Sequence, residues 1–115
     1  MAGRGLPEAA VDQVRRWCAE RVPERVRDQV RIACEEAPRH LTVVECRSPW
    51  NGDPGAEWTR LPVARFHYTR STDTWTLYYR GRNLRFHRYD PAPPSADIGS
   101  LLAEVDRDPT AIFWG

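Results

Sequence analysis

The chain has 115 residues, the length of one domain, of which 41% are hydrophobic and 29% are charged. This composition excludes a disordered chain. All 17 basic residues are arginine, and the formal net charge is +1. Three widely spaced cysteines without a Cys-x-x-Cys pair argue against a disulfide framework and a zinc knuckle. No apolar run approaches the length that crosses a membrane. We therefore predict one soluble, cytoplasmic domain over residues 1–115 that holds no metal or cofactor.

The first periodic segment predicts a helix over residues 7–21. Apolar side chains recur there at helical spacing, and Pro7 suits a first turn because the N–H that proline lacks would be unpaired there. From Val30 the apolar period changes to two, which indicates strands over residues 30–35 and 41–46. The segment 48–55 contains two prolines, two glycines, Asn51 and Asp53, and is predicted to be a surface loop.

Three more strands follow, at about residues 58–70, 74–80 and 83–89, where Pro62 indicates an edge position or a bulge. Ser95 can then cap a final helix whose apolar residues recur at helical spacing, at positions 98, 101, 102 and 105. The predicted fold is α+β, in the order α-β-β-β-β-β-α. It is a five-stranded antiparallel meander with an N-terminal helix packed on one face and a short C-terminal helix.

The register of the last three strands follows if their two short turns, near residues 72–73 and 81–82, each have two central residues. The apolar side chains of all three strands then fall on one common face, and a slip of one residue would scramble that agreement. The opposite face carries seven basic or polar side chains, which are the predicted binding residues: Arg65, His67, Tyr78, Arg80, Asn83, Arg85 and His87.

In this register Arg65 lies opposite Arg80, and His67 lies opposite Tyr78. Like charges directly opposite each other destabilise a sheet, so the pair of arginines needs a counter-charge. An anionic partner can supply it, and so can a carboxylate of the protein itself. Residues 57–90 carry seven arginines and three acids, whereas residues 91–115 carry one arginine and four acids. Both explanations stay open at this point.

Guanidinium, imidazole and phenol groups are suited to phosphate and to unpaired bases, so the leading hypothesis is a binding module for an anionic partner, with RNA as the candidate. An RNase-type, toxin-like enzyme is an alternative, because His67 or His87 can act as an acid or base beside arginines. A second alternative is a protein interaction domain or homodimer that uses Trp50 and the Phe113-Trp114 tail. A third is a small-ligand pocket between the first helix and the sheet.

Three stretches resemble a known family over nearly the whole chain. They are Glu57-Trp58-Thr59-Arg60-Leu61-Pro62, then Asn83-Leu84-Arg85-Phe86-His87-Arg88-Tyr89-Asp90, and then residues 101–109 with the ending Ile112-Phe113-Trp114-Gly115. The chain is similar in these to a bacterial, mainly actinobacterial family that is known as a domain of unknown function, number thirty twenty-four. The resemblance implies membership and a cytoplasmic setting, and no activity or active site.

Overall fold

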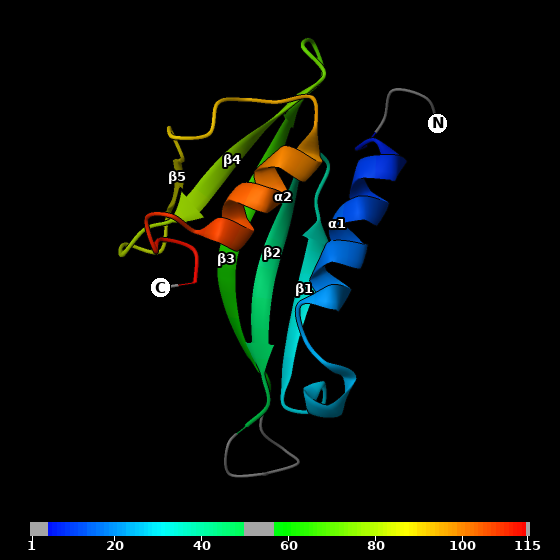
Figure 1. The fold of residues 1–115 in the computed structure, drawn as a ribbon, viewed down its shortest axis with the longest axis vertical. Helices are drawn as coiled ribbons and strands as arrows, with labels where there is room; N and C mark the ends of the chain where they lie inside the picture. Colours follow the sequence, from blue (N-terminus) through cyan, green and yellow to red (C-terminus); the bar gives the residue numbers. More distant parts are fainter. Residues whose placement is uncertain (1–4, 50–56, 115) are drawn as a thin grey trace.

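The computed structural model describes residues 5–49 and 57–114, and it confirms the predicted α+β order (Figure 1). The described elements are helix α1 (Glu8–Glu20), a 3-10 turn η1 (Glu24–Val26), strands β1 (Val30–Glu36), β2 (His40–Arg47), β3 (Thr59–Thr69), β4 (Thr74–Arg80) and β5 (Phe86–Arg88), and helix α2 (Ile98–Arg107). The five strands form one antiparallel sheet in the order β1-β2-β3-β4-β5, so each strand pairs with its neighbour along the chain.

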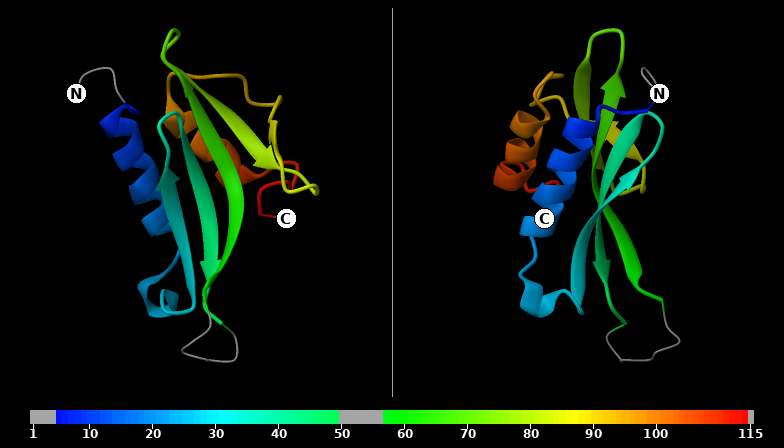
Figure 2. Two further views of the ribbon diagram at one scale, coloured as in Figure 1. Left: turned by 180° about the vertical axis from the view of Figure 1, so that it is seen from behind. Right: turned by 90° about the vertical axis from the view of Figure 1, so that its right-hand side faces the viewer.

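Both helices lie on the same side of the sheet, as the two views of Figure 2 show. The apolar faces of α1 and α2 and the alternate residues of the strands beneath them form one core. Its members with no more than 2% of their surface exposed include Val14, Leu41, Val43, Phe66, Leu77, Leu101 and Val105. The opposite side of the sheet carries no helix among the described residues.

The cap of α2 differs from the prediction by two residues. Asp97, not Ser95, is the N-cap, and its side chain accepts a hydrogen bond from the backbone N–H of Gly99 at 2.9 Å. The Ser95 hydroxyl oxygen instead accepts from the N–H of Asp97 at 3.0 Å, while its backbone bridges to Trp75. Both side chains are good caps, and the backbone pairing of Ser95 with the sheet decides between them.

The bulge expected at Pro62 is confirmed, but the edge position is not, since β3 lies in the middle of the sheet. The pairing of β2 with β3 shifts between Val43 and Val44, which pair with Ala64 and Pro62, so Val63 is the extra residue. The bulge lets a strand that contains proline remain central, because the missing N–H falls at an irregular point of the ladder.

The predicted register is wrong at both short turns. Four residues, 70–73, separate the paired residues Thr69 and Thr74, so the pairing of β3 with β4 is displaced by two positions from the prediction. Because this displacement is even, each side chain of β3 and β4 keeps its predicted face. Arg65 therefore lies opposite Tyr78 and not opposite Arg80, and the predicted pair of like charges does not form.

The second turn is longer by an odd number of residues. The N–H of Gly81 donates to the carbonyl of Arg85 at 2.8 Å, which leaves three central residues, the last of them Leu84 with φ of 64°. This is the geometry of a three-residue hairpin loop whose third residue is left-handed. The odd change turns β5 over, so Phe86 and Arg88 lie on the face away from the helices.

Candidate functional site

The side of the sheet away from the helices is here called the open face. Strand register and side-chain alternation place on it Arg31, Ala33, Glu35, His40, Thr42, Val44, Arg60, Arg65, His67, Thr76, Tyr78, Arg80, Phe86 and Arg88. These strand positions include five arginines and a single carboxylate, Glu35, whose oxygens accept hydrogen bonds from the Arg60 guanidinium. The open face is therefore strongly basic, and its acidic group is already paired.

Four of the seven predicted binding residues share this face: Arg65, His67, Tyr78 and Arg80. The Arg65 guanidinium lies centrally among them. Its Nε donates to the Thr42 hydroxyl at 3.0 Å, and its Cζ atom lies over the Phe86 ring, 4.1 Å from the ring centroid. The contact with Phe86 exists only because the three-residue turn brings that ring to this side.

No carboxylate among the described residues forms an ion pair with Arg65 or Arg80. Arg80 donates from Nε to the carbonyl of Pro62 at 3.1 Å, which fixes the side chain without neutralising it. Partial burial, and after it the charge of Arg60, lowers the pKa of the Arg65 guanidinium. Because burial disfavours the charged form of Arg65 and no carboxylate of the described chain pairs with it, an anion placed beside its guanidinium would be attracted.

His40 completes this group and was missed by sequence reasoning. It pairs directly with His67 across β2 and β3, with ring centroids 6.4 Å apart and planes at 23°. The His67 ring also meets Tyr78 edge-on at 6.3 Å. His40 Nδ1 is buried and has no hydrogen-bond partner among the described residues. Burial, followed by the charges of Arg65 and His67, lowers the His40 pKa. No motif marks His40, because its place follows from the register alone.

The other three predicted residues do not join the open face. His87 lies on the helix side, where its ring is 5.5 Å from that of Tyr79 and its Nε2 is 3.2 Å from Asn83 Oδ1. Asn83 stands in the turn and also accepts from the N–H of Arg85 at 3.1 Å, and the Arg85 side chain is exposed. The prediction of one seven-residue face is therefore wrong for this group, because the odd turn inverts β5.

The acidic C-terminal segment does not cover the open face. Asp106 accepts from the Trp17 indole at 3.0 Å and pairs with Arg21, and both contacts lie on the helix side. Glu104 is buried there, where it accepts from the Tyr89 hydroxyl at 2.8 Å and pairs with Arg107. Of the two counter-charges that the sequence left open, a carboxylate from α2 is thus ruled out in the described structure.

The C-terminal tail packs on its own domain. Phe113 is buried with 8% of its surface exposed, and the Trp114 indole donates to the carbonyl of Val105 at 3.0 Å. Trp50, the other aromatic residue predicted to contact a partner, lies outside the described residues.

Residues 5–49 and 57–114 contain no group of three or more His, Cys, Asp or Glu side chains placed to hold a metal ion. Within the same residues, neither helix has the length and apolar character needed to span a membrane.

Comparison with known proteins gives a match to one family model. No curated protein and no solved structure matches the chain. A family model matches residues 5–115, which include all the strands and both helices described above. That match confirms the family resemblance seen in the sequence. The chain therefore belongs to the family described as Domain of unknown function (DUF3024).

Proposed function

We propose that this protein is a non-enzymatic binding module whose open face holds single-stranded RNA. The observation that carries the proposal is the Arg65 guanidinium, half-buried on the Phe86 ring and without a carboxylate partner among the described residues. In this role Arg65 and Arg80 contact phosphate oxygens, because a guanidinium matches the geometry of phosphate. The rings of His67 and Tyr78 stack against bases.

The shape of the face favours a single strand over a duplex. Major-groove recognition uses a helix or a two-stranded ribbon that projects into the groove, whereas both helices here lie behind the sheet (Figure 2). A sheet surface with aromatic rings between cations suits unstacked bases, since every base offers a face for stacking. The half-buried Tyr78 and His67 rings, 6.3 Å apart, supply such a surface next to Arg65.

The test is fluorescence anisotropy with a labelled single-stranded RNA of mixed sequence at 50 and 200 mM salt. We expect salt-dependent binding that weakens about tenfold or more in Arg65→Ala, since a charged hydrogen-bonded contact contributes about 1.5–3 kcal/mol. The slope of log K against log salt should fall by about 0.7, the value for one phosphate contact on a single strand.

Arg16→Ala is the matched control, because Arg16 is an exposed arginine of α1 on the other side of the sheet. It removes the same charge and should leave affinity nearly unchanged. Equal losses in Arg16→Ala and Arg65→Ala would show that only net charge matters. Absence of binding at 50 mM salt would refute the proposal outright.

RNA cleavage is a second candidate, favoured by the His40–His67 pair. One imidazole could take the 2′-hydroxyl proton while that oxygen attacks phosphorus, and the other could protonate the departing 5′-oxygen, leaving a 2′,3′-cyclic phosphate. His87, which the sequence offered as the alternative acid or base, lies on the other side of the sheet. The same RNA, run on a denaturing gel after incubation, tests this: cleavage that His67→Ala abolishes would support it, and intact RNA would exclude it.

A further inference from the structure

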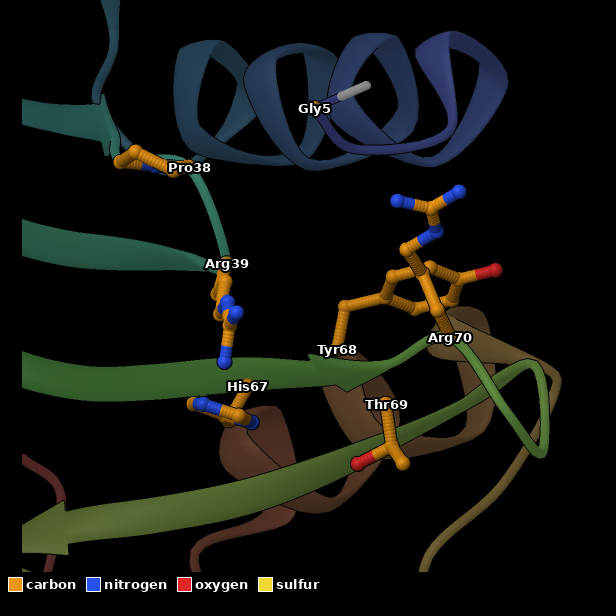
Figure 3. A pocket seen from close by; sticks show the side chains of 7 residues that line it. All are labelled: Gly5, Pro38, Arg39, His67, Tyr68, Thr69 and Arg70. Carbon is orange, nitrogen blue, oxygen red and sulfur yellow. The ribbon is translucent and has the colours of Figure 1, made fainter. Parts of the chain in front are cut away.

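A cavity of 480 Å³ opens at the end of the sheet beside the N-terminal end of α1 (Figure 3). Its size falls in the usual range of small-ligand sites, roughly 300–1,000 Å³. The lining residues come from three places: the segment before α1, the β1–β2 turn and the end of β3. They are Gly5, Pro38, Arg39, His67, Tyr68, Thr69 and Arg70.

The charge of this cavity comes from two arginines. Arg39 extends from the β1–β2 turn toward His67, and Arg70 extends from the end of β3 toward the segment before α1 (Figure 3). Of the described residues that line it, none carries a carboxylate. Within the described chain neither guanidinium forms an ion pair, and the nearby carboxylate of Asp73 accepts from the Tyr68 hydroxyl at 2.6 Å. Each of these guanidinium groups has the geometry and charge that suit a phosphate.

The remaining walls suit a flat, weakly polar group. Tyr68 and Pro38 supply aromatic and aliphatic surface, and the Tyr68 ring is supported from behind by Trp75 at 4.9 Å. The hydroxyl bond to Asp73 fixes the outer end of the same ring. A ring held at both positions is a preorganised stacking surface, which lowers the entropy lost when a ligand binds.

His67 belongs both to the cavity and to the open face. Its ring lies 6.4 Å from that of His40 and 6.3 Å from that of Tyr78, so the open-face group borders the cavity at His67, whereas the next residue, Tyr68, faces the helix side of β3. A strand lying across Tyr78 and His67 would bring one of its ends to Arg39, at the mouth of the cavity.

We propose that this cavity binds a phosphorylated nucleotide, with Arg39 and Arg70 on the phosphate and Tyr68 against the base. The ligand has two sources, a free nucleoside monophosphate or the phosphorylated end of an RNA strand, and the second source rests on the proposed function. This assigns a chemical class, a phosphate joined to a planar ring, to a site separate from the Arg65 contact.

The experiment compares one RNA sequence with a 5′-phosphate, with a 3′-phosphate and with two hydroxyl ends, and titrates AMP and inorganic phosphate separately. We expect a terminal phosphate to tighten RNA binding about tenfold or more, and Arg39→Ala or Arg70→Ala to abolish that gain. Both side chains are exposed, so these variants should fold normally, and circular dichroism checks this. Arg16→Ala is again the matched control.

The outcomes separate this inference from the function on which it partly rests. If RNA binds equally well with all three kinds of end and AMP does not bind, the cavity proposal is refuted while the open-face proposal stands. If AMP binds through Arg39 and Arg70 but RNA does not bind, the free nucleotide is the ligand and the open-face proposal fails. Inorganic phosphate binding as tightly as AMP would overturn the role given to Tyr68.

Discussion

Asp108 fastens the C-terminal tail to the domain, and its removal is the sharpest test of how the helix side is held together. Its Oδ1 accepts from the backbone N–H groups of Ile112 at 2.8 Å and Phe113 at 3.0 Å, and its Oδ2 accepts from that of Trp114 at 2.9 Å. Asp108 is also the C-cap of α2 in the left-handed conformation, with φ of 43°. Phe113 then packs against Tyr89, with ring centroids 5.0 Å apart.

Asp108→Ala removes all three hydrogen bonds at once. If the tail stayed docked, each N–H left without a partner would cost about 1–3 kcal/mol. If the tail detached, those groups would be hydrated and the main cost would be exposure of Phe113, about 1.5–3 kcal/mol. The variant adopts whichever of these two states costs less, so that cost is the upper limit of the loss from the tail. Alanine in the left-handed region adds about 1 kcal/mol to the loss. We therefore expect the free energy of unfolding to fall by about 3 kcal/mol.

Urea unfolding followed by tryptophan fluorescence measures this loss. Asp108→Gly is the control for backbone strain, because glycine adopts a positive φ freely and should recover about 1 kcal/mol of the loss. Asp108→Asn keeps one carbonyl oxygen and should fall between the wild type and Asp108→Ala. A loss below about 0.5 kcal/mol in Asp108→Ala, small beside the exposure cost of one phenyl ring, would refute the reasoning.

Two further predictions concern single residues. Burial is the chief reason that the pKa of His40 is lower in the folded protein than the value of about 6.5 in the unfolded chain. At pH values between these two pKa values, the unfolded chain therefore binds more protons than the folded protein does. Stability should therefore fall as pH drops below about 6.5, less so in His40→Gln, and an unchanged urea midpoint from pH 7.5 to 5 in both proteins would contradict this. Leu84 is 71% exposed and has a φ of 64°. Because asparagine adopts the left-handed region more readily than leucine, Leu84→Asn should raise the free energy of unfolding by about 0.5–1 kcal/mol. Thermal unfolding of the two proteins checks the sign, and a lower midpoint in Leu84→Asn would count against it.

The helices and strands could be predicted because hydrophobic period is a local property. In α2, Ile98, Leu101, Leu102 and Val105 recur at helical spacing, and the structure buries all of them. In β4, Trp75 and Leu77 alternate with polar residues, and both are buried in the core. Such patterns depend on which side chains avoid water and not on how a turn closes.

The pairing of strands could not be predicted in the same way, because it depends on turn length. Gly81-Arg82 looks like a two-residue turn, yet the hydrogen bond from Gly81 to Arg85 closes three residues with Leu84 left-handed. Leucine is a poor residue for that conformation, so composition gives no sign of it. One added residue then moves every side chain of β5 to the other face.

The same difference between even and odd register shifts decides which residues of the candidate site were predicted correctly. Arg65, His67, Tyr78 and Arg80 lie on β3 and β4, where the error was an even number of residues, and they share the open face as predicted. The β5 side, with His87, was inverted by the odd error. His40 could have been found only by pairing β2 with β3, and the bulge between those strands has no clear signal in the sequence beyond Pro62.

The placement of the acids explains why the open face is basic even though the chain is nearly neutral. Asp97 caps α2, Glu104 and Asp106 bond to Tyr89 and Trp17, and Asp108 holds the tail. Each of these carboxylates has a structural role behind the sheet, so none is available to the arginines in front of it. In the proposed function, the basic open face would orient an approaching anionic strand before contact. On that proposal, the anion would meet the sheet where Arg65 lies between Thr42 and Phe86, since the acids of the C-terminal segment are already engaged behind it.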